Sequence, residues 1–279
     1  FISSGHTVVE GNLLQWYKES HMQDPQERRG VGGDYWIWEY PDYSKNYIVV
    51  ADVARGDGGD YSTFHVMDVE SVTQVAEFKA QLSTKEFGNM LVNVATEWNN
   101  ALLVIENANI GWATIQVAID RDYTNLYYTY RNDGVTDFDV AMDKGYDLKD
   151  KSQMDPGFTT LARTRPLLIS KLDIYFREKE CIVRSKRLLD ELFVFIWNGS
   201  KAEAQRGYND DLVMAFAIAL YVRDTALKLR QHGLDLNRAA LSSLGSSKTK
   251  SVYTTNDNHV PGVWDVNMGD HNEDLTWLL

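Results

Sequence analysis

The sequence of 279 residues contains a single cysteine, Cys181. One cysteine excludes an internal disulfide and a zinc site built from several cysteines, and it fits a reducing compartment. No run approaches the ~20 apolar residues that a membrane-spanning helix needs, so we expect no membrane partner. The first residues, Phe1 to Gly5, include no methionine and no signal-peptide core, which predicts a fragment of a longer protein.

Positive charge is also scarce. The chain has 28 Lys and Arg against 40 Asp and Glu, a net charge of −12. This balance runs against nucleic-acid binding, which usually shows as an excess of Lys and Arg. It does not exclude such binding, because a carboxylate site that recruits divalent cations is itself acidic and the bound ions reverse its local sign. A hydrophobic content of 44% with 33 aromatic residues (8 Trp, 15 Tyr and 10 Phe) supports a buried core.

The order of the predicted elements is that of an α/β fold. Residues 47–54, 61–69 and 73–81 form three strands joined by turns, which is typical of an antiparallel meander. A helix over 84–98, a strand over 101–106, a helix over 110–121, a strand over 126–130 and helices over 167–176, 185–195 and 209–231 follow. This order predicts a ribonuclease H-like (RuvC or integrase type) mixed sheet, with antiparallel first three strands and flanking helices.

Two acidic residues end apolar strands that should lie side by side. Asp52 shares one face of its strand with Ile48 and Val50, because side chains alternate with period two. Glu106 ends the strand over 101–106 in the same way. An acid in this position is costly unless something satisfies it. A bound cation is one solution, and salt bridges or helix-cap contacts are others.

The last predicted helix opens with the acidic pair Asp210 and Asp211. At about 100° per residue, Asp211 lies closer to the apolar stripe of this helix, whereas Asp210 points almost directly away from it. Asp211 is therefore better placed to reach the sheet. The alternative is N-capping, with Asn209 or Asp210 as the cap. Asp60, at the start of the second strand of the meander, is a further candidate for the cluster.

Such a cluster suits hard cations. Mg²⁺ and Mn²⁺ choose carboxylate oxygens and keep several waters. Two such ions ~3.5–4 Å apart can clamp a phosphodiester, one activating a water for in-line attack and the other stabilising the leaving 3′ oxygen. The six histidines show no ligand spacing, and we expect His65 to be packed rather than catalytic. The cluster predicts hydrolysis of DNA with two Mg²⁺ or Mn²⁺ ions.

Four separated motifs follow one another along the chain. They are Ala51–Gly56 with Asp60–Phe64, Ile105–Asn107 with Gly111–Trp112, Gly157–Thr160 with Thr164–Pro166, and Gly207–Leu212. Over roughly residues 1–225 the chain resembles the nuclease domain of tailed-bacteriophage large terminases, especially the T-even type. The resemblance implies an endonuclease that cuts concatemeric double-stranded DNA with little sequence specificity. It also implies metal-binding acids at Asp52, Glu106 and the Asp210–Asp211 pair, with an additional acid at Asp60.

The resemblance further implies a viral packaging motor. Its partners would be the portal, the small terminase subunit and the chain's own ATPase domain, and it would work in the host cytoplasm, docked on the prohead and absent from the mature virion. No G-x-x-x-x-G-K-[ST] phosphate loop occurs in the chain, so we expect no ATPase activity from it. We expect residues 1–34 to be a linker region from the missing ATPase domain and residues 35–231 to be the nuclease domain. Residues 131–156 would be an inserted hairpin or loop, and 232–279 a polar C-terminal tail.

Basic residues gather before the last acidic motif. As phosphate contacts they would position DNA without reading its sequence, and a solvated helix face is the alternative for them. They are Arg163, Arg165, Lys171, Arg184, Lys186, Arg187, Lys201 and Arg206. Two other functions stay open: a ribonuclease H-like resolvase or transposase with the same carboxylates, and a non-catalytic docking module of a phage motor.

Overall fold

The computed structural model describes residues 7–55, 60–108, 110–130, 154–224 and 227, and two short strands near the C-terminus. The chain divides into two compact units, Phe1–Lys228 and Leu229–Leu279. In the second unit, β11 (Asp265–Asn267) and β12 (Asn272–Asp274) pair as an antiparallel hairpin within the predicted tail. The rest of that tail, and residues 131–153 of the predicted insertion, lie outside the described residues.

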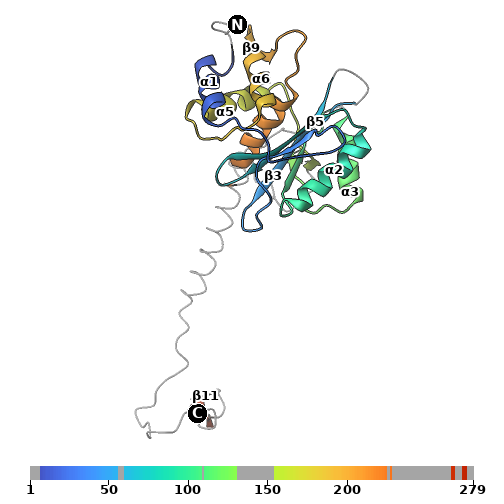
Figure 1. The fold of residues 1–279 in the computed structure, drawn as a ribbon. Helices are drawn as coiled ribbons and strands as arrows, with labels where there is room; N and C mark the ends of the chain where they lie inside the picture. The colour runs from blue at the N-terminus through green and yellow to red at the C-terminus, as the bar shows by residue number, and fades with distance from the viewer. Residues whose placement is uncertain are drawn as a thin grey trace. The chain divides into compact units, whose positions relative to one another are not determined.

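A six-stranded mixed sheet forms the centre of the first unit (Figure 1). Its strands are β1 (Glu27–Arg29), β2 (Tyr35–Ile37), β3 (Tyr47–Asp52), β4 (Ser62–Asp68), β5 (Thr73–Ala80) and β6 (Leu102–Ile105). Their order across the sheet is β1-β2-β5-β4-β3-β6, and each neighbouring pair is antiparallel except β3 and β6, which are parallel. The predicted antiparallel meander is confirmed, as is the mixed character of the sheet.

Helices cover both faces of the sheet, and each face has its own apolar core (Figure 1). On one face, α2 (Thr84–Glu97) and α3 (Gly111–Asp120) bury Val49 and Ala51. On the other, α1 (Gly11–Ser20), α5 (Arg165–Arg177), α6 (Lys186–Val194) and a helix over 211–224 bury Ile48 and Val50. Because side chains alternate along β3, Asp52 lies on the same face as Ile48 and Val50. The acid at the end of β3 therefore faces the core that contains the helix over 211–224.

Local sequence explains where the long helix on the first face begins. Ser83 and Glu86 form a capping box at the start of α2, in which the Glu86 amide donates to the Ser83 hydroxyl at 3.3 Å and the Ser83 amide donates to the Glu86 carboxylate at 3.2 Å. Phe87 and Leu91 then recur at helical spacing and are fully buried. The helix predicted over 84–98 is thereby confirmed.

Several elements differ from the sequence prediction. Residues 126–130 were expected to form one strand; Leu126 forms a parallel bridge with Leu103 of β6, and β7 (Tyr128–Tyr130) then pairs with β8 (Met154–Pro156) in a two-stranded sheet. The helix predicted over 185–195 ends one residue earlier, because β9 (Phe195–Asn198) begins there and forms a hairpin with β10 (Lys201–Ala204). Both strand pairings depend on contacts with a second segment, which local patterns do not show.

The start of the chain packs within the first unit. Val8, Leu14 and Tyr17 are buried in the same core as α6, and β1 forms an edge of the sheet. Residues 7–30 therefore have structural contacts in this unit, and their role as a linker region from an ATPase domain stays a prediction. Within the part of the chain that the structure describes, no helix combines the length and the apolar character needed to cross a membrane.

An aromatic stack on the α2 side of the sheet offers a test of the core. Phe64 is fully buried, with ring centroids 5.3 Å from Phe78 and 6.4 Å from Phe87. Phe64→Ala leaves a cavity, so we expect it to lower the free energy of unfolding by about 3–5 kcal/mol in urea titrations. The control Tyr43→Ala removes a ring that is 75% exposed and should change it by less than about 0.5 kcal/mol. Equal effects of the two substitutions would contradict this core.

Candidate active site

Asp52 and Glu106 are neighbours where β3 and β6 end. The parallel register pairs Ala51 with Ile105, and the Glu106 amide donates to the Ala51 carbonyl oxygen at 3.0 Å. The next residue along each strand is the acid, and the two carboxyl groups share a hydrogen bond. The structure thus brings together the two acids that the strand pattern singled out.

The surroundings of Asp52 perturb its carboxyl group. Burial raises the pKa of Asp52 well above its ordinary value, as do the charge of Glu106, the hydrogen bond with Glu106 and the charges of Asp211 and Asp210. A raised pKa favours the protonated form of Asp52, which carries no negative charge. A single proton therefore relieves part of the repulsion within a group of four acids.

The start of the helix over 211–224 reaches the same strand ends. The Tyr61 amide donates to Asp211 Oδ2 at 3.3 Å, and the Thr63 hydroxyl donates to the Asp211 carbonyl oxygen at 3.3 Å. Thr63 is the register partner of Asp52 across β3 and β4. β4 and the residue before it therefore hold Asp211 beside Asp52, and burial raises the pKa of the Asp211 carboxyl.

Asp210 makes a different contact. Its Oδ2 accepts a hydrogen bond from Arg165 Nη2 at 2.8 Å, and the same nitrogen donates to the Ala202 carbonyl oxygen at 3.2 Å. The Asp210 carbonyl oxygen accepts from the Met214 amide at 2.8 Å, which places Asp210 at the N-cap of the helix. Asp211 is thus held towards the strand ends and Asp210 towards Arg165, in agreement with the helical phase.

Asp60 is exposed next to Tyr61. The charges that raise the pKa of Asp52 come from the other three acids and not from Asp60. Residues 56–59, which include the turn residue Asp57, lie outside the described part of the chain. The role of Asp60 as a further member of the cluster therefore stays a prediction.

The donor set has the chemistry of a site for hard cations. Asp52, Glu106 and Asp211 offer carboxylate oxygens, the ligands that Mg²⁺ and Mn²⁺ prefer. Crowding of carboxylates raises the pKa of one of them. A divalent cation can replace the proton that this group binds. As they stand, no three His, Cys, Asp or Glu side chains of the described residues are arranged to hold a metal ion.

Two motif glycines allow close backbone packing around Glu106. A Cβ atom on Gly111 would lie 1.9 Å from the Glu106 carbonyl oxygen. Gly157 has a φ of +87°, which favours glycine, and a Cβ atom there would lie 2.5 Å from the Ile105 carbonyl oxygen. Phe158, the next residue, forms a parallel bridge with Glu106. Packing at the end of β6 is the physical reason for glycine in these two motifs.

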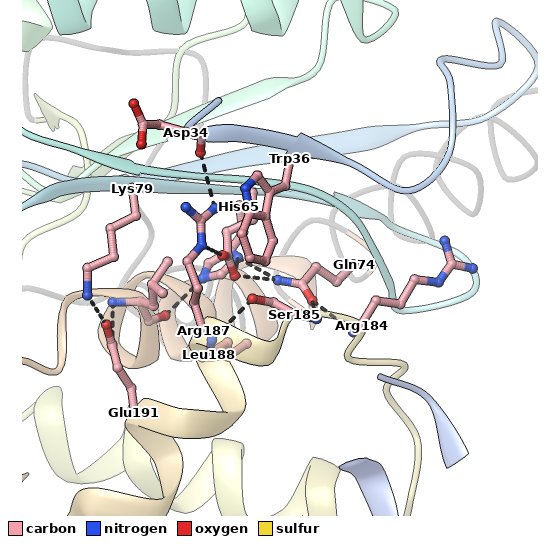
Figure 2. A network of polar contacts seen from close by, with 12 residues as sticks. Asp34, Trp36, His65, Gln74, Lys79, Arg184, Ser185, Arg187, Leu188 and Glu191 are labelled. Carbon is pink, nitrogen blue, oxygen red and sulfur yellow. Dashed lines mark hydrogen bonds and ion pairs between the residues drawn. The ribbon is translucent and has the colours of Figure 1, made fainter. Parts of the chain in front are cut away.

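Two charged residues that the sequence predictions did not include are Glu191 on α6, on which the charge of Asp211 acts, and Lys79 on β5. Their side chains point at each other in Figure 2. They form an ion pair, and the second carboxylate oxygen of Glu191 accepts from the amides of Leu212 and Val213 at 3.0 and 3.3 Å. Burial raises the pKa of Glu191 to about 7, and the charge of Lys79 opposes this rise. The available signal was an acid at helical spacing on the leucine-rich face of α6.

His65 is packed, as predicted. It is fully buried, and its Nε2 donates to the Leu212 carbonyl oxygen at 2.9 Å. A carbonyl can only accept, so Nδ1 is the unprotonated nitrogen and accepts from Gln74 Nε2 at 3.0 Å. Burial lowers the pKa of His65, which favours this neutral form.

The eight basic candidates fall into two groups. Five form ion pairs: Arg165 with Asp210, Lys171 with Asp224, Arg184 with Glu39, Arg187 with Glu77 and Lys201 with Glu203. The other three, Arg163, Lys186 and Arg206, are exposed and form no ion pair with a residue that the structure describes. Arg165 is the one that the structure places in direct contact with the acidic pair.

No family model matches the chain. It is similar to the solved structure of the large terminase nuclease from thermophilic phage G20c with bound magnesium, at 18% identity over 78% of this chain and 98% of that one, with a TM-score of 0.56. The same nuclease with bound cobalt is 17% identical over the same shares, with a TM-score of 0.56. A third structure of it is 19% identical over 77% and 97%, with a TM-score of 0.53. This likeness confirms the ribonuclease H-like fold and does not single out the T-even type.

The raised pKa of Asp52 makes stability depend on pH. The folded state holds this proton more tightly than the unfolded state, so the contribution to stability is complete below the ordinary pKa of Asp and is lost as the pH rises through the raised value. Asp52→Asn keeps a hydrogen-bond donor without the charge. In EDTA, we expect the wild type to lose more thermal stability than Asp52→Asn between about pH 5 and pH 8.

Thermal unfolding followed by circular dichroism measures this difference. Glu191 titrates in both proteins, so its own effect largely cancels in the comparison. Parallel curves for the two proteins would contradict a protonated carboxyl at Asp52.

Proposed function

We propose that this chain is the nuclease domain of a large terminase, an endonuclease that cuts concatemeric double-stranded DNA in a viral packaging motor. The observation that carries this proposal is the meeting of Asp52, Glu106 and Asp211 at the end of β3 and β6. The fold is that of the G20c large terminase nuclease, which has been solved with bound magnesium and with bound cobalt. Those structures support a divalent-metal requirement here.

The proposed metal ligands are Asp52, Glu106 and Asp211, with Asp210 as the alternative to Asp211 and Asp60 as an additional acid. The proposed cofactor is a pair of Mg²⁺ or Mn²⁺ ions. Bound in pairs, such ions activate a water and stabilise the charge that develops on the phosphodiester as it is cut. Asp52 releases its proton to join the ligand set, so we expect protonation and metal binding to compete.

The chain's basic side chains would hold the DNA backbone. Arg165 lies against Asp210 next to the cluster, where its guanidinium can bind a phosphate beside the cleavage point. Arg163, Lys186 and Arg206 are exposed and would be further phosphate contacts. Contacts of this kind do not read bases, which supports cutting with little sequence specificity. Lys171, Arg184, Arg187 and Lys201 would need to exchange an acidic partner for a phosphate.

The remaining parts of the proposal follow from the terminase assignment. The protein partners would be the portal, the small terminase subunit and an ATPase domain joined through residues 1–34. Cutting would take place in the host cytoplasm on a docked prohead, and the motor would leave before the virion matures. The tail over 232–279 would be separate from the nuclease domain over 35–231.

Loss of a proposed ligand should abolish cleavage. Glu106→Gln and Asp52→Asn keep side-chain size and remove a carboxylate that Mg²⁺ needs. Both variants should leave supercoiled and linear double-stranded DNA uncut in Mg²⁺ or Mn²⁺, while the wild type cuts both and EDTA stops it. The control Asp24→Asn changes a side chain that is 99% exposed and should cut like the wild type.

Each alternative has its own outcome in this assay. Unchanged cutting by Glu106→Gln or Asp52→Asn would refute the proposed site. Selective cleavage of four-way junctions over plain duplex would favour a resolvase or transposase. A wild-type protein that is inert in both metals would favour a docking module of a phage motor.

The two acids of the helix start should differ in their effect on cleavage. Asp211→Asn removes a proposed ligand and should abolish cutting. Asp210→Asn frees Arg165 and disturbs the site indirectly, so we expect a loss of about 10- to 100-fold. Initial rates on a supercoiled plasmid at saturating Mg²⁺ measure both. A larger loss for Asp210→Asn would exchange the roles of the two residues.

A further inference from the structure

The helix that carries the acidic pair is capped from outside. The first amides of a helix have no partner within it and are usually satisfied by the N-cap side chain. Here the N-cap side chain, Asp210, binds Arg165 instead. The amides of Leu212 and Val213 donate to Glu191 Oε2 at 3.0 and 3.3 Å. An acid from another helix, α6, therefore performs the capping, and neither member of the pair is used for it.

Glu191 is itself held by the sheet. Lys79, near the end of β5, forms an ion pair with its other carboxylate oxygen, and the two side chains point at each other in Figure 2. The side chains are 10% exposed for Glu191 and 18% exposed for Lys79. A carboxylate so buried is stable only with partners, and this one has an ammonium group and two backbone amides. Glu191 therefore joins β5, α6 and the helix start.

A second contact acts on the same turn. His65 on β4 donates to the Leu212 carbonyl oxygen, and Gln74 holds its imidazole from the other side (Figure 2). The Gln74 side-chain oxygen accepts from the amides of Arg184 and Ser185, both at 2.9 Å, at the start of α6. The sheet and α6 thus hold both the N–H and the C=O group of Leu212, the residue that follows Asp211.

We propose that Glu191, held by Lys79, is a positioning residue for the carboxylate cluster. The Leu212 amide nitrogen is bonded directly to the carbonyl carbon of Asp211, so a shift of that amide moves Asp211 and its carboxylate as well. Catalytic constellations tolerate displacements of only about 0.5 Å. The inference rests on the proposed nuclease function, because it assigns Glu191 a role in placing one of the proposed metal ligands.

The contacts of Glu191 favour positioning over direct ligation. One carboxylate oxygen pairs with the Lys79 ammonium and the other accepts from two amides. A ligand needs a lone pair directed at the cation, and both oxygens are directed at these other groups. Asp211, in contrast, accepts only weakly, at 3.2 Å from Asn209 and 3.3 Å from Tyr61.

Mn²⁺ affinity, measured by electron paramagnetic resonance of the free ion, tests the proposal without relying on turnover. Glu191→Ala leaves the first-turn amides without their acceptor, so we expect Mn²⁺ to bind about 10- to 100-fold more weakly. The Mn²⁺ concentration for half-maximal cleavage should rise by the same factor. The double variant Glu191→Gln with Lys79→Met keeps a side-chain oxygen that can accept from the Leu212 and Val213 amides. It also removes the Lys79 ammonium group, which would have no ionic partner beside a glutamine. It should bind Mn²⁺ nearly as tightly as the wild type.

A matched control changes the far end of the same helix. Asp224 binds Lys171 at 2.6 Å and Arg223 at 3.3 Å, so Asp224→Asn also removes an acid that is paired with basic side chains. It should leave Mn²⁺ affinity unchanged. Wild-type affinity in Glu191→Ala would overturn the proposal. A loss in the double variant equal to that in Glu191→Ala would also overturn it, because the charge and not the amide contacts would then matter.

Two further measurements keep the test decisive. If Glu191→Ala does not fold, Glu191→Asp takes its place, because it withdraws the carboxylate by one methylene. This variant should show an intermediate loss of Mn²⁺ affinity. Wild-type affinity in it would refute the proposal. If the wild type neither binds Mn²⁺ nor cuts DNA, the proposed function fails by itself. Hydrogen exchange at Leu212 and Val213 then tests the capping alone: the two amides should exchange faster in the Glu191 variant, and unchanged exchange would overturn the capping role.

Discussion

The parallel pairing of β3 with β6 places two acids in contact, although their charged forms repel each other. Ala51 faces Ile105, so Asp52 and Glu106 follow at the same level. A parallel pair requires a crossover connection, and here β4, β5 and α2 form it on their way across the sheet and back. Burial and the neighbouring acids raise the pKa of Asp52 well above its ordinary value. The same features that make the pair costly without a partner make it suitable for a divalent cation.

At the start of the helix over 211–224, acidic side chains are needed both to cap the free amides and to supply carboxylates to the cluster. An acid at a helix start is normally used to satisfy the free amides, and an acid used in that way has fewer lone pairs for other ligands. In this protein the tasks are divided among three acids. Glu191 caps the amides, Asp210 binds Arg165, and Asp211 is held beside the strand ends.

Under the proposed function, the distribution of charge predicts that this domain binds DNA only weakly by itself. Most of the basic candidates are already paired with acids, so they add little positive field around the cluster. Arg165 differs from the other paired residues in its place, because its partner Asp210 is one of the four acids of the cluster. Under the proposed function, most of the affinity for DNA would come from the ATPase domain or from other subunits of the motor.

Local periodicity in the sequence determined the strands around Asp52 and Glu106, the faces they share and the helical phase that separates Asp211 from Asp210. Alternation and helical phase are properties of neighbouring residues, so no distant contact is needed to read them. Tertiary structure alone decided the rest: the pairing of β7 with β8, the β9–β10 hairpin, the acidic partners of five basic candidates, and the capping by Glu191. The ion pair between Lys79 and Glu191 joins residues 112 positions apart. Such a contact depends on which elements the sheet brings together, and no pattern within either segment specifies its partner.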